Sequence, residues 1–306
     1  MMQSSLALTP TNMAAMAYCP RLFFINKTMP QHGFISNLPT VQGNVEHEAW
    51  RLLAEAFDVA WREWSPATTL SAISQDSING TLSHVFNLSL ENHPSHALDL
   101  KKYMQDLTYR LDLWLAIQEK NMLKLLHEGF SIDHIVSVML PWKTEEKVFS
   151  NKFGLYGRVD AIYNDGIYII PEDIKTHQSK FKTLLQKDSH KTQLLCYCIM
   201  LEENFDIPAP EARIFYTQDL SYETFKANVD EKIQLIEKIT TARELIERAE
   251  IPPMLPKEDA AKCRHCYARE QCFKLAREQG EIEWIDRLLQ GSDQRFDLFG
   301  GANHAN

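Results

Sequence analysis

The sequence predicts an α/β fold in which a mixed central β-sheet is flanked by helices, and two observations support it. Residues 155–176 show runs of apolar and β-branched residues on both sides of the turn signal Asn164-Asp165-Gly166. Helical periodicity dominates 45–61 and 101–128, where apolar residues recur three and four positions apart. A chain of 306 residues can form one large domain or two small ones, and we expect a single domain over residues 1–278.

The N-terminal part of the chain opens with a helix signal. Thr9 and Pro10 fit an N-cap followed by proline at the first helical position, so a helix is expected to reach about Cys19. After it, in chain order, we expect a buried apolar run at 21–25, a loop rich in Gly, Pro and Asn at 28–44, and the helix at 45–61.

The long segment 58–139 is expected to be a mostly helical insertion that covers one side of the core, because the pattern at 101–128 is helical. Strand signals begin at 134–138. Beyond the 155–176 hairpin we expect, in chain order, a helix at 191–203, a strand at 212–216, a long helix at 221–250, a C-terminal segment at 251–278 and a polar tail at 279–306.

The overall charge gives no hint of a nucleic-acid partner. The net charge is −9 and the isoelectric point is near 5.7, and an acidic chain is not an obvious binder of phosphate. A local strip of basic residues can still bind a phosphate backbone, so the charge pattern near any candidate site matters more than the total.

The sequence predicts a cytoplasmic protein without a membrane span. It contains no run of eighteen apolar residues, and residues 1–20 lack the basic start and apolar core of a secretory signal. In a reducing cytoplasm, the six cysteines are better explained by metal binding or burial than by disulfides.

The central hairpin carries two carboxylates and a lysine. Asp173 and Lys175 lie two positions apart on one strand and therefore share a face, while Asp160 lies on the partner strand. If Asp165-Gly166 forms a two-residue turn, Asn164 pairs with Ile167, and Asp160 then faces the same side as the other two.

Such a group can hold a metal ion and hydrolyse a phosphodiester. Two carboxylates supply the hard oxygen ligands that Mg²⁺ or Mn²⁺ prefers, and the cation lowers the pKa of a bound water. Lys175 would orient that water or neutralise charge on the phosphate. Glu172 has the wrong parity for this face unless a bulge intervenes. The alternative is a surface hairpin with scattered charges.

Two further features follow the hairpin. Gln193 and Tyr197 lie four positions apart and are neighbours on one helical face. A run of basic residues with only Asp188 among them could form a DNA-binding strip, although a solvated loop would look the same. Its members are Lys175, Lys180, Lys182, Lys187 and Lys191.

The cysteines fall into two groups. Cys263, Cys266 and Cys272 form a C-x2-C-x5-C pattern, to which Cys19 or His265 could add a fourth ligand for zinc or an iron–sulfur cluster. Cys196 and Cys198 would point about 200° apart on a helix, so they cannot both serve one site and are expected in the core.

Together these residues resemble the CRISPR-associated RecB-like exonucleases (the Cas-four family) of the PD-(D/E)XK nuclease superfamily. The resemblance covers roughly residues 8–57 and 140–278. It rests on Tyr18-Cys19-Pro20-Arg21, Gly43 to His47, Gly157-Arg158-Val159-Asp160, Pro171-Glu172-Asp173-Ile174-Lys175, Gln193 to Tyr197 and the three C-terminal cysteines.

The resemblance implies a restriction-endonuclease-like core, a 4Fe-4S cluster with Cys19 as its first ligand, and His47 as a metal ligand beside Asp160 and Asp173. It also implies hydrolysis of DNA from single-stranded ends, trimming DNA for a CRISPR integrase. Two features depart from the family: residues 58–139 are much longer than usual, and Asp173 stands where Glu is common.

Two other functions fit the same residues. A repair, recombination or mobile-element nuclease would have the same site without a CRISPR role. A DNA-binding or scaffolding module with an iron–sulfur cluster and an inert site belongs to a different class, and the intact Asp160, Asp173 and Lys175 set argues against it.

Overall fold

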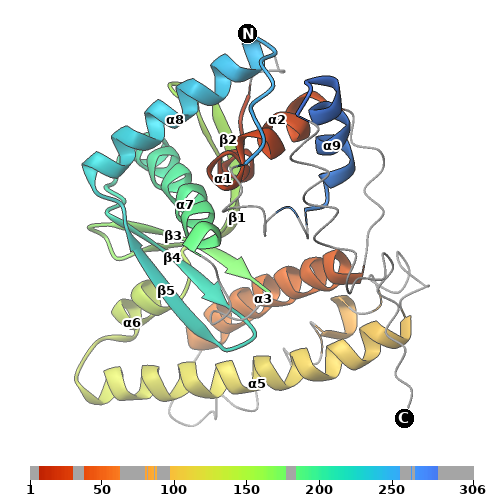
Figure 1. Cartoon of the computed structure of the whole chain (residues 1–306). Helices are drawn as coiled ribbons and strands as arrows, with labels where there is room; N and C mark the ends of the chain where they lie inside the picture. Colours follow the sequence, from red (N-terminus) through yellow and green to blue (C-terminus); the bar gives the residue numbers. More distant parts are fainter. Residues whose placement is uncertain are drawn as a thin grey trace.

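The computed structural model describes residues 7–29, 38–62, 80, 82–85, 87, 97–176, 184–255, 263 and 266–281. Its centre is a sheet with the strand order β1-β2-β3-β4-β5 (Figure 1). Neighbouring strands are antiparallel except β3 and β4, which are parallel, so the sheet is mixed as predicted. The strands are β1 (Lys143–Ser150), β2 (Leu155–Asn164), β3 (Ile169–Lys175), β4 (Glu211–Tyr216) and β5 (Ser221–Lys226).

Helices cover both faces of the sheet. Helix α7 connects the parallel strands β3 and β4 and, with α1 and α8, packs on one face, while α3, α5 and α6 pack on the other (Figure 1). Helices α2 and α9 lie side by side at one end, although they come from opposite ends of the chain. The described helices are α1 (Pro10–Tyr18), α2 (Pro20–Thr28), α3 (Leu38–Arg62), α5 (Ala97–His127), α6 (Ile132–Met139), α7 (Leu184–Phe205), α8 (Val229–Glu247) and α9 (Arg269–Glu278).

The first core lies between the sheet and α7. Residues 192–201 of α7 are all buried, so this helix is enclosed on every side. It packs on Val159 and Ile162 of β2, on Ile214 of β4 and on Leu235 of α8. Cys196 and Cys198 belong to this core, as expected.

The second core joins the sheet to the helices that the long insertion provides. Trp50 of α3 makes edge-to-face contacts with Trp114 of α5 at 5.3 Å and with Phe215 of β4 at 4.9 Å between ring centroids. Helix α5 therefore packs against α3, and Nε1 of Trp114 also donates to the hydroxyl oxygen of Tyr222 in β5 at 3.3 Å, so the insertion is part of the core rather than an appendage.

Several predicted elements are confirmed. Thr9 caps α1 in a capping box with Asn12, and Pro10 occupies the first turn. The helices expected at 45–61, 101–128 and 191–203 and the strands at 157–163 and 212–216 are present, although their ends differ by several residues.

Three predicted assignments are wrong. Residues 38–44 begin helix α3 rather than ending a loop. Residues 134–138 lie in helix α6, which begins after the capping side chain of Ser131. Residues 221–226 form strand β5, because this alternating segment pairs with β4, and helix α8 begins only after the N-cap Asn228.

Other predictions lie beyond these residues. The polar tail from 282 onward and most of the stretch 63–96 fall outside the described part of the chain. Across the described residues, no helix combines the length and apolar character that crossing a membrane requires.

Candidate active site

The pairing of β2 with β3 brings the predicted carboxylates together. Asn164 pairs with Ile169, so the loop has four residues and the predicted pairing of Asn164 with Ile167 is wrong by two positions. The side chain of Asp165 caps this longer loop by accepting hydrogen bonds from the backbone of Ile167 and Tyr168, both at 2.8 Å. Because the shift is even, the faces are unchanged, and continuing the register sets Asp160 opposite Asp173.

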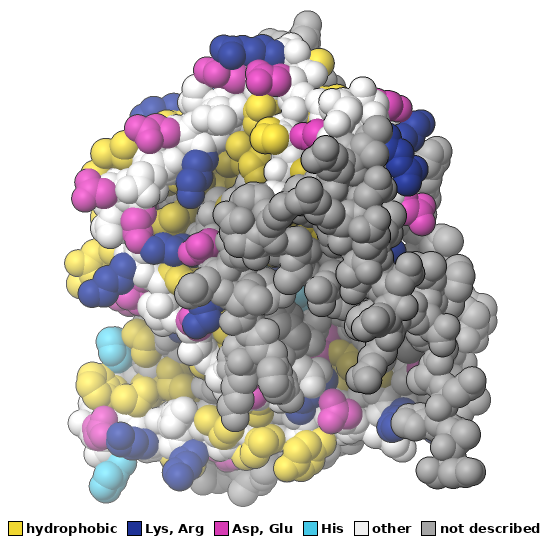
Figure 2. Space-filling model, in the orientation of Figure 1, with side chains coloured by type: hydrophobic (Ala, Val, Ile, Leu, Met, Phe, Trp, Pro, Cys, Tyr) yellow, Lys and Arg dark blue, Asp and Glu magenta, His cyan; other side chains and the backbone are white. Residues whose placement is uncertain are grey.

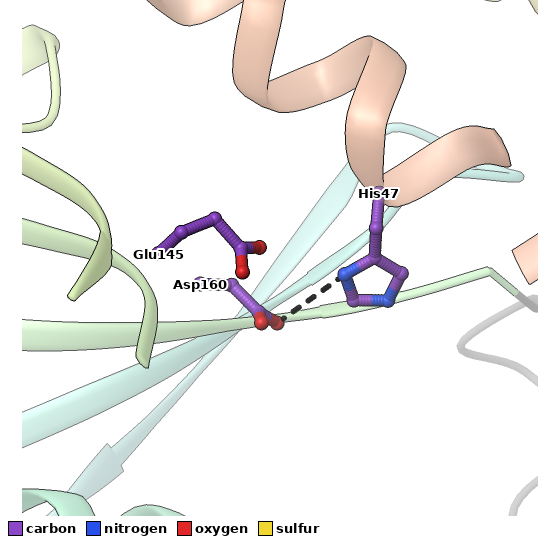
Figure 3. Close-up of side chains that lie close together, drawn as sticks. All are labelled: His47, Glu145 and Asp160. Atoms are coloured by element: carbon purple, nitrogen blue, oxygen red, sulfur yellow. Dashed lines mark ion pairs between the residues drawn. The ribbon is translucent and has the colours of Figure 1, made fainter. Parts of the chain in front are cut away.

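Asp160 lies at the centre of a group that could hold a metal ion. Its Oδ2 accepts a hydrogen bond of 2.7 Å from the backbone of Ile174 and lies 3.7 Å from Nδ1 of His47 (Figure 3). Helix α3 points His47 at Asp160, and Glu145 reaches the same point from strand β1. One ligand atom from each of these three residues lies within 4.8 Å of the other two.

Glu145 is the site residue that the sequence reasoning missed. The register on either side of it, Thr144 with Ala161 and Glu146 with Val159, sets it opposite Asp160. Its backbone has φ of 51°, which is unusual for a residue with a side chain and interrupts the pairing at this position. Strand β1 was not among the predicted elements, so no sequence pattern placed Glu145 beside the hairpin.

Asp173, Lys175, Gln193 and Tyr197 form a connected group next to this site. Nζ of Lys175 lies 2.7 Å from Oδ2 of Asp173 and donates to Oε1 of Gln193 at 3.3 Å. Nε2 of Gln193 donates to Oδ1 of Asp173 at 2.8 Å and to the hydroxyl oxygen of Tyr197 at 3.3 Å. The four residues from β3 and α7 therefore hold one another in place.

The electrostatics of the site favour a bound cation. Burial raises the pKa of Asp160 well above its ordinary value, and the neighbouring Asp173 raises it further. Burial also raises the pKa of Glu145 and lowers the pKa of His47. A divalent cation would offset the repulsion between the carboxylates, and the neutral form of His47 is the one that binds metal.

Glu172 points away from this group, because it lies one position before Asp173 on β3 and therefore faces the other side of the sheet. Its carboxylate forms an ion pair with Arg213 at 2.5 Å and accepts a hydrogen bond from Tyr163 at 3.3 Å on the other side of β3. The guanidinium of Arg213 in turn lies over the ring of Tyr163 at 3.6 Å. Glu172 therefore belongs to a buried structural cluster.

A family model described as the PD-(D/E)XK nuclease superfamily matches residues 7–273, which is most of the chain. The chain belongs to the PD-(D/E)XK nuclease superfamily. The predicted superfamily and the mixed sheet that it implies are thereby confirmed.

Two curated relatives match part of this chain. The DNA replication ATP-dependent helicase/nuclease DNA2 of Saccharomyces cerevisiae is 25% identical over 168 residues, which are 48% of this chain and 10% of that protein. The protein of the same name from Schizosaccharomyces pombe is 25% identical over 183 residues, 58% of this chain and 13% of its own length. The match thus covers only a small part of the length of these relatives.

The predicted lysine strip of the nuclease is only partly described. Lys180 and Lys182 lie outside the described residues. Lys187 forms an ion pair with Glu223 at 3.4 Å, and Lys191 pairs with Glu231 of α8. The three described members of the strip therefore face acidic partners, because Lys175 also pairs with Asp173, and the strip stays a prediction.

The four cysteines predicted to bind a cofactor meet at one pocket. Cys19, Cys263, Cys266 and Cys272 all line it, together with apolar residues such as Leu22 and Ile25 of α2. Burial raises the pKa of Cys272 to about 11, and the other three thiols add to this shift. The thiols from the two ends of the chain are thus near neighbours, as a shared cofactor would require.

A buried ion pair supports the helix that carries His47. Glu46 is fully buried and pairs with Arg110 of α5, and it also accepts a hydrogen bond from Tyr103. The same Nη1 atom of Arg110 donates to the backbone oxygen of Thr217 at 3.1 Å. The backbone of Thr217 then donates to the carbonyl of Lys175 at 3.0 Å, so the insertion contacts both sides of the site.

Proposed function

We propose that the protein is a metal-dependent DNA exonuclease that hydrolyses phosphodiester bonds at single-stranded ends. The observation that carries this proposal is the convergence of His47, Glu145 and Asp160 within 4.8 Å, beside the linked pair Asp173 and Lys175. Four elements, α3, β1, β2 and β3, supply these groups, and membership in a nuclease superfamily gives the arrangement a known chemistry.

The proposed roles follow from the contacts. His47, Glu145 and Asp160 would hold Mg²⁺ or Mn²⁺, with Asp173 as a further ligand. When bound, the cation lowers the pKa of a water molecule and polarises the phosphodiester. Lys175, held by Asp173 and Gln193, is placed to orient the attacking water or neutralise charge on the phosphate. Tyr197 keeps its proton, because burial raises its pKa, and it can support Gln193 by hydrogen bonding.

We also propose that the four cysteines hold a 4Fe-4S cluster. All four thiols line one pocket, as a shared cofactor would require. The resemblance of Cys19 and the C-x2-C-x5-C segment to the Cas-four pattern favours a cluster over a single zinc ion.

For the biological role, trimming DNA for a CRISPR integrase is the proposal that the motifs support. The two relatives are named as DNA replication helicase/nucleases, which supports the alternative of a nuclease without a CRISPR role, such as a repair, recombination or mobile-element nuclease. The genes beside this one would separate the two roles. A non-catalytic iron–sulfur module that binds DNA is the alternative of another class, and activity itself would exclude it.

The decisive test of the activity uses end-labelled DNA. The protein should shorten a labelled single strand in Mn²⁺, should act more slowly on a blunt duplex, and should be inactive in chelator. Asp160→Asn, which keeps the size of the side chain, should remove cleavage while the melting temperature shows a folded protein. Equal cleavage by wild type and Asp160→Asn would exclude this site, and internal cuts in a circular single strand would exclude an exonuclease.

A further inference from the structure

One face of the β1–β2 hairpin presents two basic and two aromatic side chains. Lys147 pairs with Arg158 and Phe149 pairs with Tyr156, and side chains directly opposite one another share a face of the sheet. Lys147 is exposed, Phe149 is 56% exposed, Tyr156 is 52% exposed and the side chain of Arg158 is 64% exposed. We call these four residues the hairpin face.

The opposite side of the same hairpin is closed. Val148 and Val159 point into the core beneath α7. A Cβ atom added to Gly157 would lie 2.9 Å from the ring of Pro10 in α1 and 3.3 Å from the ring of Tyr197 in α7. The packing of the hairpin is thus complete on that side, and the fold does not need the aromatic rings of the hairpin face for its core.

The hairpin face begins at the metal site. Nε of Arg158 lies 2.6 Å from Oε2 of Glu145, and Asp160 follows two residues later on β2. From Asp160 to Tyr156 the strand covers roughly 13 Å, at about 3.3 Å per residue. The order from the site outward is therefore carboxylates, then the two basic residues, then the two rings.

We propose that the hairpin face binds the single-stranded DNA whose end lies in the active site. Lys147 and Arg158 would contact phosphates, and Phe149 and Tyr156 would stack on bases. A basic surface joined to aromatic rings is the arrangement by which proteins hold single strands without reading sequence. This inference rests on the proposed nuclease function and adds the strand's path to it.

Single-stranded DNA is the expected ligand because stacking on the two rings requires an exposed base face. In a duplex the base faces are covered by their neighbours, so the rings would gain little from it. β1 is the edge strand of the described sheet, and exposed aromatic residues on an edge strand favour aggregation. Their presence there is better explained if a ligand covers them.

The test measures binding in chelator, where the metal-dependent cleavage cannot proceed. The two probes are a fluorescent oligothymidylate and an abasic deoxyribose-phosphate strand of the same length. Replacing both rings with threonine, which suits a strand, should weaken binding of the oligothymidylate by about tenfold or more. Binding of the abasic strand should not change, because it has no base to stack.

Three further variants complete the design. Phe149→Trp with Tyr156→Trp should keep the affinity, since both rings remain. Lys147→Ala should weaken the binding of both probes to the same extent. It should also reduce the slope of log affinity against log salt by about 0.7, the value for one phosphate contact on a single strand. Tyr109→Thr is the matched control, because this ring on α5 is 67% exposed and lies outside the hairpin face.

Two results would overturn the inference. One is a double threonine variant that binds oligothymidylate as tightly as wild type, or that loses the same affinity for both probes. The other is a wild-type protein that binds neither probe. The nuclease proposal fails separately, because a wild type that shows ring-dependent binding yet does not cleave in Mn²⁺ would leave the hairpin face in place.

Discussion

At the scale of single residues, Asp160 is a largely but not fully buried carboxylate that faces a second carboxylate. Its folded pKa is raised well above the ordinary value of 3.8 by burial and by Asp173. Between these two pKa values the folded protein binds a proton more tightly than the unfolded chain. Without metal, the free energy of unfolding must therefore fall as the pH rises through this window.

This sign gives a prediction for the metal-free protein. Asp160→Asn removes the titration, so in chelator the variant should lose less unfolding free energy than wild type between pH 5 and pH 7. Added Mn²⁺ should stabilise wild type at pH 7 and have little effect on the variant. Urea unfolding at both pH values measures this, and identical pH slopes for the two proteins would refute the burial argument.

A second prediction separates two neighbouring carboxylates. Asp173→Ala should abolish cleavage in Mn²⁺ while the protein stays folded, and Lys175→Ala added to it should cost little more activity, because both act in one assembly. Glu172→Gln should keep cleavage per folded molecule but destabilise the protein, since its charged partner Arg213 is largely buried. Activity that survives Asp173→Ala and is lost in Glu172→Gln would reverse these roles.

The sequence predicts the position of a site residue where the two-residue period of a strand determines which face its side chain lies on. Asp173 and Lys175 lie two positions apart, so they share a face whatever the loop length. The register error of two positions is even, so it leaves Asp160 on that same face. Glu145 was beyond reach for a physical reason. Its approach to Asp160 depends on the pairing of β1, whose polar sequence lacks a clear alternating pattern, and on a left-handed backbone.

At the scale of elements, the insertion helix α5 supports the site through buried contacts to the segments that carry His47 and Lys175. Arg110 contacts Glu46, which precedes His47, and Thr217, which bonds to the backbone of Lys175. Removing only one member of such a buried pair leaves an uncompensated charge, at a cost of about 3–5 kcal/mol. The insertion is therefore expected to affect both stability and metal binding.

The matching prediction uses a double variant as its control. Arg110→Met should destabilise the fold by about 3–5 kcal/mol and weaken Mn²⁺ binding, because Glu46 and the helix of His47 lose their anchor. Arg110→Met combined with Glu46→Gln should recover part of the stability. Urea unfolding and Mn²⁺ calorimetry measure both quantities. Unchanged Mn²⁺ affinity in a well-folded Arg110→Met protein would limit this pair to a structural role.

Errors in the predicted elements have local causes. Three of the residues at 134–138 are β-branched and apolar (Ile135, Val136 and Val138), yet the cap at Ser131 and packing against α3 and α5 make the segment helical. Residues 221–226 alternate as a strand does, but they lie just before a strongly helical stretch. The predicted helix therefore begins too early, at residue 221. Pairing with β4 makes the segment a strand, and its short alternation alone does not decide between a strand and the first turns of the following helix.

At the scale of the whole molecule, two segments that are far apart in the sequence meet, namely α2 and the stretch from α9 to residue 281. Arg21 of α2 is fully buried and pairs with Glu281 at 2.6 Å, just beyond α9. Close by, Cys19 caps α2 while Cys266 and Cys272 pack beside it. The C-terminal spacing indicated a cofactor site, and the resemblance supplied Cys19 as the fourth ligand across more than two hundred residues.

The prediction for this end of the molecule concerns iron. Protein purified without oxygen should contain iron and acid-labile sulfide, and Cys19→Ser or Cys263→Ser should lose both and melt at a lower temperature. Cys196→Ala is the control that should keep the iron, because this thiol lies in the core under α7. A colourless, stable protein with one bound zinc would rule out the cluster.

Charge is also a property of the whole molecule. The chain carries a net charge of −9, and on the face in Figure 2 acidic and basic side chains of the described residues are interleaved over α8 and α5. DNA would therefore be held by a narrow surface such as the hairpin face rather than by a broad basic one. Its affinity should accordingly depend on few phosphate contacts and show a shallow dependence on salt.

The most direct test of the central claim is a Mn²⁺ titration of cleavage, comparing wild type with Glu145→Gln. Glu145 was found only through the structure, so its effect tests the three-residue metal group itself. The variant should need at least about tenfold more Mn²⁺ for half-maximal cleavage, in line with the loss of one charged ligand. Overlapping Mn²⁺ curves, or no cleavage by wild type at any Mn²⁺ concentration, would contradict the account.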